Sequence, residues 1–104
     1  RSVRGGGVMR AGPGTRPPED LPVAVAASWS PVSVLETKGA AFSTFDLPGD
    51  AEAEVRRALA GAGCDPRVTT QGPASVYTCD GLANGLTISV VPGETSRVSV
   101  AWKR

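Results

Sequence analysis

Apolar and polar residues alternate most regularly in the last part of the chain, on either side of a turn-forming segment. Residues 87–91 and 98–102 are rich in valine and flank Pro-Gly-Glu-Thr-Ser at positions 92–96, a composition typical of a turn between two strands. An antiparallel register pairs apolar residues on one face: Val90 with Val98, Ile88 with Val100, and Leu86 with Trp102. Because the residues between them take the other face, this pattern predicts a hairpin with one buried side.

A second hairpin is indicated just upstream. Residues 68–70 and 76–78 are short segments of β-branched and aromatic character, and Gln-Gly-Pro-Ala at 71–74 separates them. Asn84-Gly85 lies between this hairpin and the last one, and such a dipeptide is the strongest short signal for a hairpin turn. Together the two hairpins predict four consecutive antiparallel strands.

The segment before these strands has the periodicity of an amphipathic helix. Apolar residues recur at three- and four-residue intervals, at Ala51, Val55, Ala58, Leu59 and Ala62, which places them on one helix face. Asp50 follows a Leu-Pro-Gly break and offers a side-chain oxygen to the first free N–H groups, while Gly61 and Gly63 are both suitable ends. A helix over about residues 50–62 is marginally stable alone, so we expect its alanine-rich face to pack closely on the sheet.

Three further segments precede the helix. Residues 23–29, 32–36 and 41–47 each have the apolar and β-branched content of a strand, and Pro31 indicates a sheet edge or a bend. If all three are strands, the order of elements is β-β-β-α-β-β-β-β. We predict an α+β fold in which one short helix packs on an antiparallel sheet of four to five strands, mostly C-terminal to the helix.

Composition divides the chain into two parts. Residues 1–20 are rich in glycine, proline and arginine and have few apolar side chains, so we expect a flexible linker. Residues 21–104 form the expected single small α+β domain. The whole chain has a net charge of +1, but four arginines precede residue 17 and the remainder carries 7 basic and 10 acidic residues, a net of −3. Such a domain is not expected to bind nucleic acid.

The two cysteines are the main indication of the cellular compartment. Cys64 follows the predicted helix, Cys79 ends the first hairpin, and pairing Thr70 with Ser75 brings the two cysteines close together. A disulfide there would stabilise the fold by about 3 kcal/mol in the chain-entropy description; the alternative is a pair of reduced, buried thiols. We expect the disulfide, and with it an oxidising, extracytoplasmic location, either secreted or anchored on the outer face of a membrane.

The residue types exclude most catalytic chemistry. The chain has no histidine, which removes the commonest general base and the Ser-His-Asp arrangement. It also lacks a Gly-x-Ser-x-Gly elbow, a phosphate-binding loop, a dinucleotide fingerprint and a set of metal ligands. Carboxylates near the predicted turns have simpler roles as caps and turn formers, namely Asp50, Asp65 and Asp80. We therefore predict a protein that is not an enzyme and that has neither a cofactor nor a metal site.

Three residues are candidate interaction anchors, because tryptophan and arginine are enriched at binding hot spots. Trp29, beside Ser30-Pro31, fits an exposed or a core position equally well, whereas the register favours the core for Trp102. Arg56 and Arg57 on the polar helix face form either a recognition patch or an ordinary solvated surface.

These features predict a non-enzymatic extracytoplasmic interaction domain. It would be tethered by its N-terminal segment, would attach to a membrane only through a segment upstream of this chain, and would bind a protein or a cell-envelope component. Two alternatives stay open. One is an accessory or substrate-recognition domain of a larger enzyme or membrane protein. The other is a small inhibitor of a secreted enzyme, acting through residues 71–74 or 92–96.

Overall fold

The computed structural model describes residues 8–12, 15–18, 20–26, 28–79 and 85–103. Within these residues the chain forms seven strands and one helix. In chain order the elements are β1 (Val8–Ala11), β2 (Ser30–Glu36), β3 (Ala40–Pro48), α1 (Glu52–Gly61), β4 (Arg67–Gln71), β5 (Ala74–Thr78), β6 (Thr87–Val91) and β7 (Thr95–Lys103).

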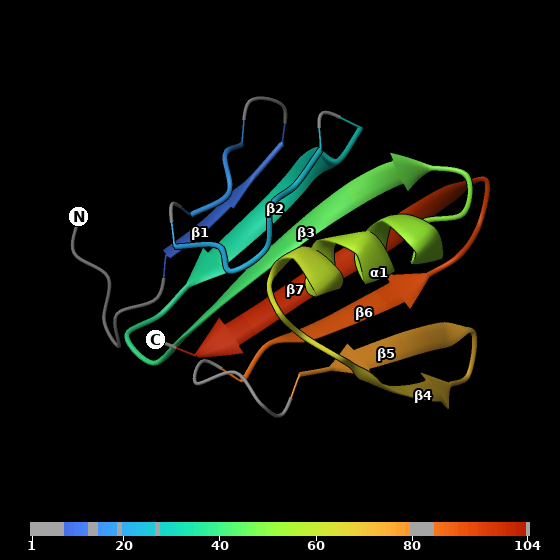
Figure 1. Cartoon of the computed structure of the whole chain (residues 1–104). Helices are drawn as coiled ribbons and strands as arrows, with labels where there is room; N and C mark the ends of the chain where they lie inside the picture. The colour runs from blue at the N-terminus through green and yellow to red at the C-terminus, as the bar shows by residue number, and fades with distance from the viewer. Residues whose placement is uncertain (1–7, 13–14, 19, 27, 80–84, 104) are drawn as a thin grey trace.

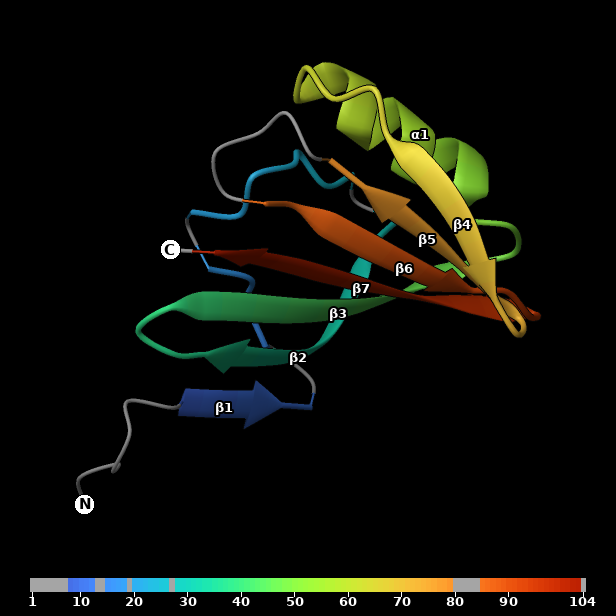
Figure 2. The same cartoon turned by 90° about the horizontal axis from the view of Figure 1, so that it is seen from below.

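All seven strands belong to one antiparallel sheet with the order β1-β2-β3-β7-β6-β5-β4. The longest strands, β3 and β7, have nine residues each and lie near the middle of the sheet (Figure 1). Helix α1 lies on one face, and no helix covers the other face in the described part of the chain (Figure 2). We call the uncovered side the open face.

The expected fold class is wrong. We predicted an α+β fold with four to five strands, mostly after the helix, whereas the protein is mostly β, with 51% of the described residues in strands and 12% in the helix. Seven strands form the sheet, and three of them precede α1. Expectation and structure differ in the chain before the helix. There, one segment with few apolar residues pairs with the sheet, and one apolar segment does not.

Strand β1 shows one side of this difference, since it lies in the segment expected to be a linker, residues 1–20. Its four residues pair with the end of β2, starting with Val8 opposite Glu36, and an ion pair of 2.8 Å joins Arg10 to Glu36. Met9 is 70% exposed. β1 therefore contacts the sheet mainly through backbone hydrogen bonds, which any sequence can form and which leave no apolar pattern.

Residues 23–29 are the opposite case, an apolar segment that does not pair with the sheet. We predicted a strand there, but the described residues of this segment form none and instead cover the core beside α1. Val23 and Trp29 are each 4% exposed, and Val25 packs against the same core. The strand prediction was wrong because burial alone, without sheet pairing, accounts for this apolar run.

The remaining strands were correctly predicted. β2 and β3 cover the predicted segments 32–36 and 41–47, and the register of β2 shifts between Pro31 and Ser33, as the proline indicated. Three of the four predicted cross-strand pairs are present, namely Val90 with Val98, Ile88 with Val100, and Thr70 with Ser75. The fourth, Leu86 with Trp102, is not a pair of the sheet, because β6 begins at Thr87. Of the predicted turn at Asn84-Gly85, Asn84 lies outside the described residues, and Gly85 has a φ of 58°.

The core lies between α1 and the sheet. Val55 and Leu59 of α1 are completely buried. The sheet contributes side chains from four strands, β3, β5, β6 and β7: Ala41, Phe45, Leu47, Tyr77, Ile88, Val90, Val98, Val100 and Trp102. As predicted, an Asp50 side-chain oxygen meets the first turn of the helix: its Oδ1 accepts a hydrogen bond of 2.9 Å from the Glu52 N–H. The N-cap residue itself is Ala51, which makes no side-chain cap bond, and the helix runs over Glu52–Gly61 rather than residues 50–62.

Candidate functional site

A groove runs between one face of α1 and residues 22–26. Its volume is about 340 Å³, at the lower end of the range typical of ligand pockets. The helix wall consists of residues that repeat with the helical period: Glu54, Arg57, Ala58, Gly61 and Ala62. The opposite wall and the remainder of the lining come from Pro22, Ala24, Val25, Ala26 and Trp29.

The groove exists because small residues face it from both sides. Its lining includes Ala58 and Gly61 of α1 and Ala62, which follows the helix, and alanines at 24 and 26 lie on the opposite wall. A Cβ added to Gly61 would meet no atom within 4 Å, so space is open beside the last turn of the helix. The surface is thus concave and mainly apolar, which suits an apolar group of a partner.

Charge is confined to one part of the lining. Arg57 Nη1 lies 2.6 Å from Glu54 Oε2, and the two side chains are 73% and 31% exposed. An exposed ion pair of this kind contributes little to stability. Arg57 is therefore free to turn from Glu54 towards an acidic group on a partner at small cost.

Arg56, the neighbouring predicted anchor, has a different position. Its guanidinium carbon lies 5.2 Å from the centre of the Tyr77 ring, within the range of a cation–π contact. The Tyr77 hydroxyl donates a hydrogen bond of 2.6 Å to Glu52 Oε1. Burial and this bond to Glu52 raise the pKa of Tyr77. Arg56 thus helps to hold α1 on β5, and it does not share a patch with Arg57.

Trp29 occupies the core rather than the surface. It is 4% exposed, and its ring meets the Phe45 ring edge-on, with 5.5 Å between centroids and 72° between planes. It nevertheless lines the same groove as Arg57, so the structure brings two of the three predicted anchors together. Ala58 and Ala62 were predicted on the apolar helix face, but their role as one wall of a groove was not, because it depends on where residues 22–26 lie.

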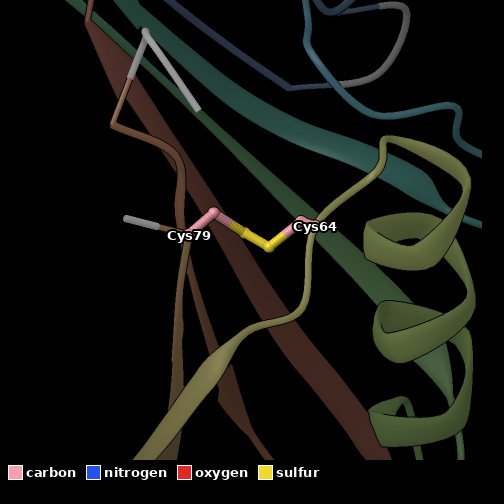
Figure 3. The surroundings of a disulfide bond; sticks show 2 residues. All are labelled: Cys64 and Cys79. Carbon is pink, nitrogen blue, oxygen red and sulfur yellow. A yellow bond between two sulfur atoms is a disulfide. The ribbon is translucent and has the colours of Figure 1, made fainter. Parts of the chain in front are cut away.

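The predicted disulfide between Cys64 and Cys79 is confirmed (Figure 3). It links the chain just after α1 to the chain just after β5, with a Cα–Cα distance of 5.8 Å. Cys79 is 1% exposed, and its N–H donates to the Leu86 carbonyl oxygen at 2.8 Å. The bond fixes one end of α1 beside the sheet, and it is compatible with an oxidising compartment.

A second hollow, of about 400 Å³, surrounds an ion pair on the open face. Arg97 donates hydrogen bonds of 2.8 and 3.1 Å to the two carboxylate oxygens of Asp46, and these bonds raise the pKa of Arg97. Each charge is thus satisfied by the other. The charged groups of this hollow are engaged with each other, whereas Arg57 of the groove beside α1 is exposed, so the groove is the better candidate site.

Two further properties concern only the described part of the chain. There, no three histidine, cysteine, aspartate or glutamate side chains gather in a way that could hold a metal ion. The helix found there is also too short and too polar to cross a membrane.

Comparisons with protein-family models, with curated proteins and with solved structures found no match for this chain. Functional inference therefore depends on the geometry of the groove and on the chemistry of its lining.

Proposed function

We propose that this protein is a non-enzymatic binding domain of an oxidising, extracytoplasmic compartment, and that the groove beside α1 receives an apolar side chain of a protein partner. The single observation that carries the proposal is the groove itself. It combines small apolar walls with one exposed arginine, Arg57, whose ion pair with Glu54 is exposed and therefore weak.

The lining determines what kind of partner segment fits. A volume of about 340 Å³ accommodates a large aliphatic or aromatic side chain and lies at the lower end of the range for small-molecule sites. Arg57 stands beside this space, where a planar guanidinium can bind a carboxylate through two hydrogen bonds. The expected segment therefore carries an apolar residue next to an aspartate, a glutamate or a C-terminal carboxylate.

The disulfide supports the proposed location. A bond between Cys64 and Cys79 persists in secreted and cell-surface proteins and is rare in a reducing cytosol. The same groove would serve a free-standing domain or an accessory domain of a larger protein, so both arrangements fit the proposal.

The groove is tested with a matched pair of helix variants. Ala58→Leu fills the groove, whereas Ala60→Leu adds the same side chain at an exposed position of the same helix. Peptides are selected from a random library on the oxidised wild-type protein, and their affinities are measured by calorimetry. We expect Ala58→Leu to weaken binding about tenfold or more, equal to about 1.4 kcal/mol, and Ala60→Leu to leave it unchanged.

A charge reversal at the groove is the second test of the proposal. Arg57→Glu is expected to abolish the preference for acidic peptides, and Arg67→Glu on β4 is the control outside the groove. Selected peptides that bind equally well to wild type and to Ala58→Leu would show that the groove is not the binding site. A library that yields no peptide above background would count against a peptide-binding function.

A further inference from the structure

The open face of the sheet carries an apolar stripe at one end. Met9, Leu35 and Phe42 lie opposite one another on β1, β2 and β3, and Ala101 of β7 continues the row. Met9 is 70%, Leu35 36% and Phe42 44% exposed. Their neighbours Val34 and Ala41 are buried on the other face. These three large side chains therefore project into solvent, and no element of the described chain covers them.

The stripe is small compared with a protein interface. At about 200 Å² for a large side chain, the three exposed fractions amount to roughly 300 Å². A stable pair of proteins buries about 800 Å² on each partner, and the rest of the open face is largely serine and threonine: Ser33, Thr44, Thr69, Thr78, Thr87, Ser89 and Ser99. A second copy of this chain would thus find too little apolar surface here.

Basic residues border the stripe. Lys103 lies opposite Ala40, two residues after Ala101 on β7. Its aliphatic carbons lie 3.6 Å from where a Cβ added to Gly85 would be. Lys38 is exposed in the turn between β2 and β3, which is closed by the hydrogen bond from the Thr37 N–H to the Ala40 carbonyl oxygen. Both lysines are therefore at the same end of the sheet as the apolar stripe.

On the open face, acidic residues lie at the opposite end of the strands from the apolar stripe; Glu36, next to Leu35 on β2, alternates to the other face and pairs with Arg10. Among the described strand residues of the open face, the single carboxylate is Asp46, and Arg97 holds it. Glu94 lies in the turn before β7, and its carbonyl oxygen accepts a hydrogen bond from Gly49, just before Asp50. The two ends of the open face thus differ in charge: the lysines and the apolar stripe lie at one end, and Asp46 and Glu94 lie at the other.

We propose that this corner, composed of Met9, Leu35, Phe42, Lys38 and Lys103, docks on an anionic lipid bilayer. Apolar side chains enter the boundary between headgroups and acyl chains while lysines pair with anionic headgroups. Long lysine stems can lie along the apolar surface and keep their charge in the headgroup layer. A bilayer requires no shape complementarity, so a small apolar stripe with a basic border is sufficient. The proposal does not depend on what binds in the groove.

The test measures co-sedimentation of the oxidised protein with vesicles of phosphatidylcholine, with and without about one third phosphatidylglycerol. We expect binding only to the anionic vesicles, and weaker binding at higher salt. Removing both lysines in the variant Lys38→Ala/Lys103→Ala should weaken it about 25-fold, at about fivefold for each lysine.

A matched pair of variants separates the corner from the rest of the open face. Phe42→Asp and Val91→Asp introduce the same charge at residues of similar exposure, 44% and 42%, at the two ends of the sheet. Phe42→Asp should weaken vesicle binding more than tenfold, and Val91→Asp should leave it nearly unchanged. Met9→Asp on the edge strand is a second corner variant that replaces Phe42→Asp if the latter fails to fold.

Three results would overturn the proposal. The first is no binding to anionic vesicles at low salt. The second is an equal loss in the Phe42→Asp and Val91→Asp variants, which would mean that the corner has no special role. The third is a dimer that Phe42→Asp converts to a monomer in analytical ultracentrifugation, which would show that a second copy covers the stripe.

Discussion

Loss of the disulfide between Cys64 and Cys79 is expected to cost a large part of the stability of this protein. The bond joins residues 15 apart in sequence, so it closes a short loop that contains all of β4 and β5. The change to make is Cys64→Ala/Cys79→Ala. Alanine keeps a small apolar side chain at the buried position 79, and the hydrogen bond from the residue 79 N–H to Leu86 is made by the backbone.

The magnitude follows from the length of the closed loop. For 15 residues the chain-entropy description gives a stabilisation of about 3 kcal/mol at 25 °C. Domains of this size are stable by about 5–15 kcal/mol in total, so the bond contributes between a fifth and more than half. At about 4–8 °C for each kcal/mol, the midpoint of thermal unfolding should fall by roughly 12–24 °C.

Urea unfolding of wild type and of the double variant, each with and without a reducing agent, measures the effect. We expect reduction to destabilise the wild type by about 3 kcal/mol and to leave the variant unchanged, with a similar dependence on urea for both. A loss below about 1 kcal/mol would refute the entropic reasoning. A variant that still responds to the reducing agent would show that the agent acts on something other than this bond.

Three smaller predictions concern side chains that hold the two layers together. Burial and the bond to Glu52 raise the pKa of Tyr77 above its ordinary 10.0. The stabilisation linked to this raised pKa is fully present below about pH 10 and is lost as the pH rises through the folded pKa. Tyr77→Phe should remove this alkaline loss; if wild type and variant lose the same free energy of unfolding between pH 8 and pH 11 in urea, the prediction is contradicted. Asp50→Ala removes the side-chain hydrogen bond to the Glu52 N–H and should cost about 1 kcal/mol, measured by thermal unfolding; an unchanged midpoint would contradict a contribution of this bond. Trp102→Phe loses the 3.1 Å hydrogen bond from the indole N–H to Asp20 and should cost about 1–2 kcal/mol, measured by urea unfolding; a Trp102→Phe protein as stable as wild type would show that water replaces this bond fully.

Much of the fold after residue 30 was predictable because there the apolar pattern and the sheet pairing have the same period. Val90 and Val98 share a face in the sequence pattern and a register position in the sheet. The helix was predictable for the same reason, since Val55 and Leu59 repeat at helical spacing and are both buried. Where one physical cause determines both pattern and structure, the sequence is sufficient.

The beginning of the chain could not be predicted in this way. Val8–Ala11 joins the sheet through backbone pairing and leaves Met9 in solvent, whereas residues 23–29 bury Val23 and Trp29 without joining the sheet. The groove was equally hidden. It depends on the absence of side-chain volume at Ala58 and Gly61, and a missing side chain has no signature unless its position relative to another segment is known.

The two proposed surfaces lie on opposite sides of one sheet, and this placement makes them separable. The groove depends on α1 and residues 22–26, whereas the lipid-binding corner lies on the open face, and the two share no residue. Layers of this kind are about 10 Å apart, a distance at which mutational effects usually add. A groove change such as Ala58→Leu should therefore leave vesicle binding unaltered, and Phe42→Asp should leave peptide binding unaltered. Loss of the disulfide differs from both, because it acts on the stability of the whole sheet and should weaken the two activities in parallel as the protein unfolds.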